Sequence, residues 1–206
     1  MEDKKRYEDI FKKYRTFIER YIPLDDEEWE LFRSKRTIRE FQKGDVILQQ
    51  GDVCGELYFI TEGLARGFMI DEKGRDFTWS IFFNDPNATV NNLFITDYKS
   101  FVRQEASSMQ IEALEDTEAV VVSYEDLVSL SGKSEKGIEF TKRMAQEAYC
   151  YLHDLVIQRQ IKSAQERFDL LIQKTPFLLE KVPQYHIATF LGITPQHLSR
   201  LKKSYG

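Results

Sequence analysis

The sequence of 206 residues has only two cysteines, Cys54 and Cys150, which lie far apart and outside any metal-binding spacing. A disulfide framework is therefore not indicated, and a reducing compartment is expected. No apolar run approaches the length of a membrane-spanning helix, and the charged segment 1–6 is not followed by the apolar core of a secretory signal. We expect a soluble, cytoplasmic protein with no membrane partner.

The sequence also lacks the residue groupings that indicate an enzyme. It has three histidines but no Ser/His/Asp grouping, no metal-ligand spacing and no glycine loop with a lysine to cradle nucleotide phosphates. Acidic segments such as 25–28 are most simply solvated helix starts. We therefore expect a protein that is not an enzyme and that holds no cofactor and no metal.

Acidic residues are absent from the last part of the chain, since no Asp or Glu follows Glu180. Residues 159–206 contain 8 Lys or Arg and 3 Asp or Glu, a net charge of +5, whereas the whole chain carries −5. The preceding residues therefore carry −10. An acidic body with a basic end is the charge distribution expected of a DNA-binding protein made of two parts.

The stretch from 182 to 203 predicts two short helices joined by a tight turn. Gly192 permits a left-handed backbone, Thr194 is a favourable N-cap, and Pro195 suits a first helical position because no amide hydrogen is needed there. The predicted buried residues are Ile187, Ala188 and Leu191 in the first helix and Leu198 and Leu201 in the second. This pattern is typical of a DNA-binding helix-turn-helix, although structural proteins also contain such hairpins.

The outward side chains of the second helix have the chemistry that recognises DNA. Amide, hydroxyl and guanidinium groups reach base edges, and lysines contact phosphates. Arg200 is the best candidate for reading a guanine edge, followed by Gln196 and Ser199. The predicted DNA-binding residues are Thr194, Gln196, His197, Ser199, Arg200, Lys202 and Lys203.

The first two thirds of the chain predict helices followed by a small β-structure. Apolar spacing predicts a helix over about 4–21, and Asp25 with Glu28 predicts the start of a second short helix. From Phe41 to Ser123, short strands separated by glycine turns predict an antiparallel barrel or jelly roll. Residues 84–108 are expected to be polar and irregular.

Residues from about 134 to 160 predict one long helix, and another is expected over 163–174. The long helix has an apolar seam with alternating spacings of three and four, which is typical of helix pairing. Small residues in the seam favour a homodimer over a helix buried within one chain. The predicted dimer interface is Ile138, Thr141, Ala145, Ala148, Leu152 and Leu155.

This order of elements resembles the Crp/Fnr family of bacterial transcription regulators, over roughly 37–203. Each motif is weak alone, but together in this order they are specific. The motifs are Gly44-Asp45-x-Ile47-x-x-x-Gly51-Asp52, Glu56-Leu57-Tyr58-Phe59-Ile60-x-x-Gly63, Ile111-Glu112-Ala113-Leu114-Glu115-Asp116 and Ile187-Ala188-x-x-Leu191-Gly192-Ile193-Thr194-Pro195-x-x-Leu198-Ser199-Arg200.

The resemblance implies an α+β fold in three parts. Residues 1–132 would be a cyclic-nucleotide-binding-like β-roll sensor flanked by helices, 133–160 a long dimerisation helix, and 161–206 a helix-turn-helix domain. The expected function is transcription regulation by a homodimer bound to a pseudo-palindromic site in double-stranded DNA. RNA polymerase and an unidentified small-molecule effector are further candidate partners.

The sequence departs from the family at the segment that binds the cyclic phosphate in the cyclic-nucleotide binders. Residues 84–109 contain no glycine and only one arginine, Arg103, whereas the family's arginine position falls near Ser107. We therefore expect no tight binding of cyclic AMP or cyclic GMP. The clustered cysteines of the family's iron–sulfur sensors are also absent. Weak candidates for contacting another effector are Trp79, Phe82 and Arg103, although a core role near Trp79, Phe82 and Phe83 is the simpler interpretation.

The second departure lies after Lys203, where only three residues follow. We therefore expect little or no wing after the helix-turn-helix, and fewer phosphate contacts as a result. The alternative function is a sensor or interaction module whose DNA-binding end is weak or vestigial.

Overall fold

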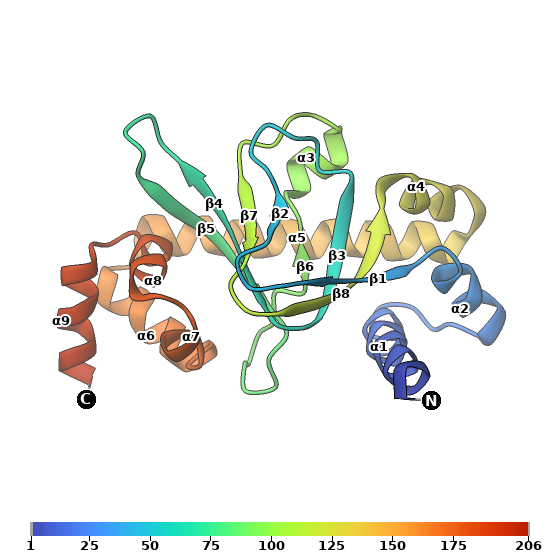
Figure 1. Cartoon of the computed structure of the whole chain (residues 1–206), viewed down its shortest axis with the longest axis horizontal. Coiled ribbons are helices and arrows are strands. Elements are labelled where there is room, and N and C mark those ends of the chain that lie inside the picture. Colours follow the sequence, from blue (N-terminus) through green and yellow to red (C-terminus); the bar gives the residue numbers. More distant parts are fainter. Residues whose placement is uncertain (1, 206) are drawn as a thin grey trace.

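A computed structural model describes the backbone of residues 2–205 and the side chains of residues 4–130 and 132–205. Its longest element is α5 (Glu135–Ile161), a helix of 27 residues that passes behind the rest of the molecule (Figure 1). The N-terminal helices lie near one end of α5, the β-strands near its middle and the C-terminal helices near its other end. This order confirms the predicted α+β fold.

The middle part is a roll of two four-stranded antiparallel sheets. Its strands are β1 (Thr37–Phe41), β2 (Val46–Leu48), β3 (Glu56–Glu62), β4 (Leu64–Ile70), β5 (Asp76–Phe83), β6 (Phe94–Ile95), β7 (Gln110–Ala113) and β8 (Thr117–Ser123). The order is β1–β8–β3–β6 in one sheet and β2–β7–β4–β5 in the other. The chain crosses from the first sheet to the second at Gly63, where φ is 106° and a Cβ atom would lie 2.5 Å from the carbonyl oxygen of Asp116. Only glycine fits that turn without a rearrangement of the backbone.

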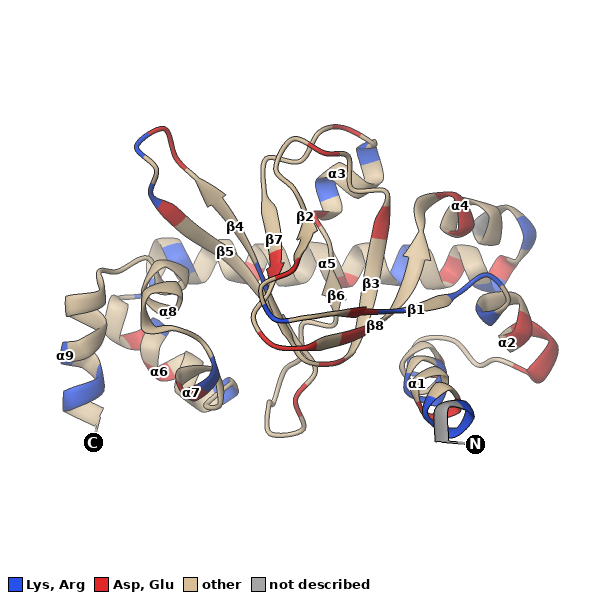
Figure 2. Cartoon of the chain, in the orientation of Figure 1, with Lys and Arg blue, Asp and Glu red and all other residues tan. Residues whose placement is uncertain are grey.

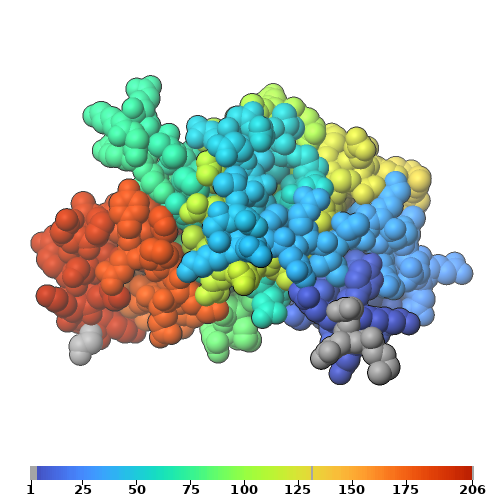
Figure 3. Space-filling view, in the orientation of Figure 1, coloured from blue at the N-terminus to red at the C-terminus, as the bar shows by residue number. Residues whose placement is uncertain are grey.

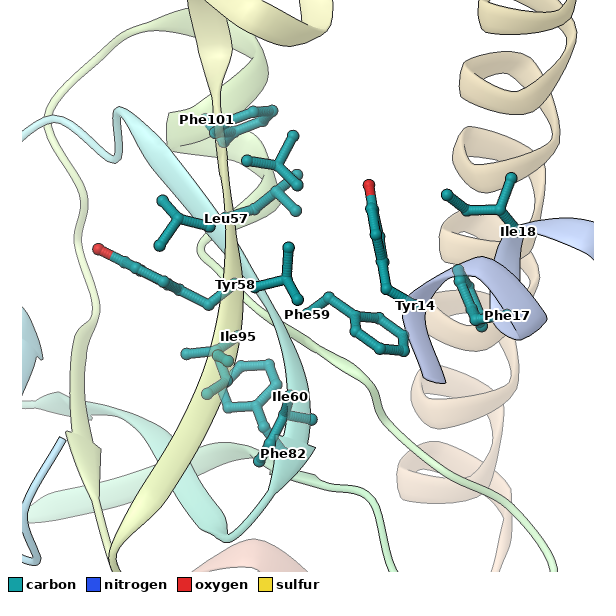
Figure 4. Close-up of a cluster of buried hydrophobic side chains, with 14 of the residues drawn as sticks. Tyr14, Phe17, Ile18, Leu57, Tyr58, Phe59, Ile60, Phe82, Ile95 and Phe101 are labelled. Atoms are coloured by element: carbon teal, nitrogen blue, oxygen red, sulfur yellow. The ribbon is translucent and has the colours of Figure 1, made fainter. Parts of the chain in front are cut away.

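The N-terminal helix α1 (Glu2–Glu19) packs on the first sheet, α2 (Asp26–Arg33) packs on α1 and α5, and both share the core of that sheet. Tyr14 and Phe17 of α1 pack against Phe59 of β3, with ring centroids 5.2 and 5.0 Å apart (Figure 4). Phe140 of α5 contacts the rings of Phe17 and Phe32. Aromatic residues therefore join α1, α2, β3 and α5 into one core.

Residues 84–108 were expected to be irregular, and this prediction was wrong in part. The segment contains β6, which pairs with β3, and α3 (Tyr98–Arg103). Asp97 caps α3 by accepting a hydrogen bond from the Ser100 amide, and Phe101 anchors the helix in the core. The cap and one buried aromatic side chain are enough to order a helix too short to show periodicity.

Helix α4 (Tyr124–Lys133) connects β8 to α5, and four helices follow α5. They are α6 (Ala164–Lys174), α7 (Leu178–Lys181), α8 (Gln184–Leu191) and α9 (Pro195–Tyr205). Their core is not separate from the roll, because the same apolar cluster contains Leu64, Ile81, Phe83 and Leu114 of the roll. The rings of Phe83 and Phe177, 5.3 Å apart, mark this contact. None of the described helices is both long and apolar enough to cross a membrane.

Candidate nucleic-acid interface

The last two helices form a helix-turn-helix with Gly192 at its turn. Gly192 has φ 68° and ψ 33°, in the left-handed region that glycine tolerates best. The amide of Ile193 donates to the carbonyl oxygen of Ala188 at 2.9 Å and closes the end of α8. These contacts confirm the predicted turn.

Thr194 caps α9 in the predicted manner. Its Oγ1 accepts a hydrogen bond from the His197 amide at 3.2 Å, and Pro195 is the first residue of the helix. Leu198 and Leu201 are buried and hold α9 against its neighbours. The side of α9 opposite these two leucines faces solvent.

The predicted base-reading and phosphate-contacting residues lie on this solvent-facing side. Gln196, Ser199, Arg200 and Lys203 are exposed, whereas His197 and Lys202 are partly buried. Figure 2 shows basic and no acidic positions on α9. Within the part of the chain that the structure describes, no carboxylate pairs with the cations of α9. Their charges are therefore available to an anionic partner.

The preceding helix, α8, packs on strand β5 of the roll. A polar network, here called the Arg66 cluster, joins the two. It consists of Arg66 of β4, Asp76 and Thr78 of β5, Glu112 of β7, and His186 and Thr189 of α8. Sequence reasoning missed this cluster, although an arginine within the otherwise apolar strand Leu64–Ile70 was a signal that a buried partner is needed.

Arg66 is the centre of the cluster, and its side chain is only 5% exposed. Its Nε donates to Glu112 at 2.6 Å, and its two terminal nitrogens donate to the carboxylate of Asp76 at 2.8 and 2.7 Å. Its Nη1 also lies 2.7 Å from Nδ1 of His186. The guanidinium stacks on the Phe68 ring, 3.9 Å from its centroid. Two carboxylates and an aromatic face thus compensate the burial of this charge.

A second contact between α8 and the roll passes through two threonines. Oγ1 of Thr189 donates to Oγ1 of Thr78 at 3.0 Å, and the backbone amide of Thr78 donates to Oγ1 of Thr189 at 3.2 Å. The Thr78 amide is free for this bond because β5 bulges beside it: Gly67 pairs with Ser80 and Phe68 with Thr78, which leaves Trp79 without a partner.

Arg159, in the last turn of α5, contacts both β5 and α8. Its Nη2 lies 3.2 Å from the carbonyl oxygen of Trp79 and 3.4 Å from that of Phe190. Its guanidinium lies over the rings of Phe77, Trp79 and Phe190, at 5.0, 4.9 and 5.8 Å from their centroids. Its buried Nε has no hydrogen-bond partner within the described residues. Arg159 therefore links the end of the long helix to the helix-turn-helix.

The predicted dimer seam on α5 is partly exposed in the single chain. Ile138, Ala145 and Leu152 are exposed, whereas Thr141, Ala148 and Leu155 are partly buried. Tyr149 and Val156, which the seam did not include, are also exposed. Three seam residues and these two additions form an exposed stripe along α5, here called the α5 stripe: Ile138, Ala145, Tyr149, Leu152 and Val156.

The segment where the family's cyclic-nucleotide binders hold the phosphate has a different chemistry here. Oδ2 of Asp97, at the start of α3, accepts a hydrogen bond from Ser107 at 2.7 Å. Ser107 is itself buried and also donates to the carbonyl oxygen of Met109. Arg103 is exposed at the opposite end of α3. A carboxylate therefore lies at the helix start, and the only arginine of the segment is not beside it.

The weak effector candidates do not converge on one site. Phe82 is buried in the roll core, Trp79 lies under the Arg159 guanidinium, and Arg103 is on the surface of α3. Phe83 belongs to the apolar cluster shared with the C-terminal helices. Phe82 and Phe83 fall in different apolar clusters because neighbouring residues of a strand point to opposite sides of the sheet, whereas Trp79 packs at the edge of the cluster that contains Phe82.

Residues 38–134 match the family model for the cyclic nucleotide-binding domain. The chain is also similar in structure to FixK2 from Bradyrhizobium japonicum, with a TM-score of 0.64 and 17% identity over 82% of this chain and 83% of that one. A protein from Eubacterium rectale assigned to the Crp/Fnr family of transcriptional regulators has a TM-score of 0.63 and 19% identity, over 90% of this chain and 87% of that one. The chain has the Crp/Fnr fold.

Another protein of this fold is CLP from Xanthomonas campestris, described as a global regulator that responds to c-di-GMP. It has a TM-score of 0.62 and 16% identity, over 88% of this chain and 91% of that one. No curated protein matches the sequence. The structural likeness therefore establishes the Crp/Fnr fold, and the functional assignment depends on the residues described above.

Proposed function

We propose that this chain is a transcription regulator of the Crp/Fnr type that binds DNA as a homodimer. The observation that carries the proposal is the solvent-facing side of α9, where Arg200, Lys202 and Lys203 form no ion pair with a carboxylate of the described residues. The Crp/Fnr fold adds support, since FixK2, CLP and the Eubacterium rectale protein share it. In this proposal 1–132 is the sensor part, 133–160 the dimerisation helix and 161–206 the DNA-binding part.

In this proposal α9 is the recognition helix and lies in the major groove. Arg200 donates two hydrogen bonds to a guanine edge, Gln196 and Ser199 contact neighbouring bases, and His197 contacts a base or a phosphate. Thr194, Lys202 and Lys203 contact phosphates. Thr194 already caps α9, whereas Gln196, Ser199, Arg200, Lys202 and Lys203 have no side-chain partner within the described residues, which suits them for contacts with DNA.

We propose that a second copy of the chain covers the α5 stripe, which overlaps the dimer interface predicted at Ile138, Thr141, Ala145, Ala148, Leu152 and Leu155. Tyr149 is 70% and Ile138 54% exposed in the single chain, which is a large apolar area to leave in water. Pairing along this stripe would position the α9 helix of each copy to contact one half-site of a pseudo-palindrome.

We further propose that cyclic AMP and cyclic GMP do not regulate this chain. The negative charge of Asp97 at the start of α3 would repel a cyclic phosphate, and buried Ser107 already donates to that carboxylate. Calorimetric titration with either nucleotide should give no binding at micromolar concentration. Micromolar or tighter binding would contradict this part of the proposal.

The central test is selection of genomic fragments by the purified full chain, followed by titration of a selected duplex and a random duplex. Wild type should prefer the selected duplex. Arg200→Ala should lose about 1–3 kcal/mol of binding to the selected duplex and little to the random one, whereas Lys202→Ala should weaken both equally. Equal losses for Arg200→Ala on both duplexes would exclude the base-reading role.

The second candidate function is a sensor or interaction module with a weak or vestigial DNA-binding end. The moderate positive charge of 159–206 favours it. A purified dimer that selects no duplex above background would favour this function over the first.

A further inference from the structure

The contact between Arg66 and His186 is the one place in the Arg66 cluster where a group that titrates near neutral pH meets a permanent cation. Nη1 of Arg66 lies 2.7 Å from Nδ1 of His186, and the two residues are 120 positions apart in the sequence. Arg66 belongs to the roll and His186 to α8, so the hydrogen bond joins the proposed sensor part to the proposed DNA-binding part.

The chemistry of the two groups fixes the protonation state of the imidazole. A guanidinium has donors only, so Nδ1 of His186 must accept with its lone pair, and the single ring proton lies on Nε2. Protonation of Nδ1 would replace the lone pair with a second N–H directed at Arg66. The hydrogen bond would then be lost, and two positive charges would face each other.

We propose that the Arg66–His186 contact is a proton-sensitive latch, which holds α8 on β5 while the imidazole is neutral and opens when the imidazole gains a proton. Opening would break the polar contacts between α8 and β5, including those between Thr189 and Thr78. The apolar contact between Phe83 and Phe177 would keep the C-terminal helices attached. The expected motion is therefore a tilt of α8 rather than a separation of the parts.

The charged groups around the imidazole set the direction of this response. Arg66 faces it from β4, Asp76 from β5 and Glu112 from β7, and the Tyr185 ring of α8 lies 5.7 Å away. Burial of the ring, followed by the charge of Arg66, lowers the pKa of His186, while the two carboxylates oppose this effect. The closed latch is therefore fully stable above the ordinary histidine pKa of about 6.5 and loses stability as the pH falls below it.

A tilt of α8 would move α9, because the two helices share a core through Ile187, Leu191 and Leu198 and are joined by only the three residues after Leu191. This consequence rests on the proposed function, whereas the latch does not. A pH-dependent attachment of α8 would then change the spacing of two recognition helices and hence the affinity for a palindrome.

The latch can be tested in the full chain without DNA through the backbone amide of Thr78, which donates to Thr189 across the interface. Its hydrogen-exchange protection, corrected for intrinsic rates, is measured by NMR at pH 7.5 and 5.5, together with titration of the three histidines. Thr78 protection should fall by up to about tenfold, because pH 5.5 lies one unit below the ordinary histidine pKa of about 6.5 that the opened latch would restore. Amides of β3 should keep their protection, which excludes global unfolding.

Two matched variants complete the test. His186→Gln keeps an acceptor for Arg66 at every pH, so Thr78 protection should change less than about twofold between the two conditions. His153→Gln removes an exposed histidine of α5 and should behave as wild type. If His186→Gln does not fold, the wild-type titration still decides, because Thr78 protection should fall as the pH drops below about 6.5 and level off once His186 is protonated.

Three results would overturn the proposal: unchanged Thr78 protection in wild type, an unchanged response in His186→Gln, or Thr78 protection that continues to fall after His186 is fully protonated. DNA titration at the same two pH values then tests the consequence for binding. A latch that opens in a chain without DNA affinity would contradict the proposed function and leave the latch standing.

Discussion

Helices α8 and α9 are neighbours joined by one tight turn, yet they use their polar side chains in opposite ways. His186 and Thr189 of α8 are bound to the roll, whereas Arg200 and Lys203 of α9 face solvent with no partner within the described residues. Both helices bury a similar apolar stripe, so hydrophobic pattern alone does not distinguish them. The polar contacts therefore distinguish α8, which is attached to the roll, from α9, whose polar side chains remain available to an external partner.

The largest change in this comparison should follow from Arg66→Met, which removes the anchor of α8. Asp76 and Glu112 would lose their cation, so the free energy of unfolding should fall by about 3 kcal/mol, at the low end for a broken buried pair because both carboxylates are partly exposed. Chemical denaturation measures this loss. Arg39→Met, which breaks an exposed pair with Glu56, is the control and should cost less than about 1 kcal/mol. Equal costs would show that α8 is not held by Arg66.

A smaller effect is expected from Gly192→Ala at the joint between the two helices. A side chain at φ 68° costs roughly 1–2 kcal/mol, so thermal unfolding should shift to lower temperature. Gly55→Ala is a suitable control, because Gly55 has no positive φ and a Cβ atom there would meet nothing within 4 Å. A Gly192→Ala variant as stable as Gly55→Ala would mean that the turn relaxes freely.

Thr194→Ala should affect α9 alone. Loss of the hydrogen bond to the His197 amide should cost about 1 kcal/mol, measured by denaturation, and should leave the hydrogen exchange of α8 unchanged. Thr194→Ser retains the capping oxygen and should remain within about 0.5 kcal/mol of wild type. A comparable cost for Thr194→Ser would argue against the cap as the cause.

The smallest stability effect is expected from Lys203→Ala on the exposed face of α9, within about 0.5 kcal/mol. In a DNA titration over salt, however, the slope of log affinity against log salt should decrease by about 1. Lys73→Ala, at the tip of the hairpin between β4 and β5, should leave the slope unchanged; this hairpin projects beside the C-terminal helices in Figure 3. An equal change for both lysines would indicate a general charge effect.

The features that were predicted correctly depend on local signals. Gly192, Thr194 and Pro195 each act on the backbone within a few residues, so the turn and the start of α9 follow from the sequence. The same holds for the short antiparallel strands separated by glycine turns that were expected between Phe41 and Ser123. Sequence signals that act within one helix, strand or turn were therefore sufficient to predict these features.

The features that were missed depend on contacts between distant segments. No local pattern pairs Arg66 with His186, and the bulge at Trp79 that frees the Thr78 amide depends on the register with β4. The α5 seam was placed from spacing alone, whereas the packing of α5 against the roll leaves Tyr149 and Val156 exposed. The sequence pattern gives α5 more than one apolar face, and tertiary packing decides which of these faces is buried.

The apolar cluster shared between the roll and the C-terminal helices has a consequence for how the chain could be divided. Leu64, Ile81, Phe83 and Leu114 fill the core beneath α6 to α9, so residues 161–206 made as a separate fragment would expose that core to water. The roll therefore supplies part of the apolar core of the last four helices. Sequence changes on the side of β4 and β5 that faces the C-terminal helices must therefore be matched by changes in those helices. Replacing residues 161–206 with the corresponding part of another protein is then a poor route to a new DNA specificity.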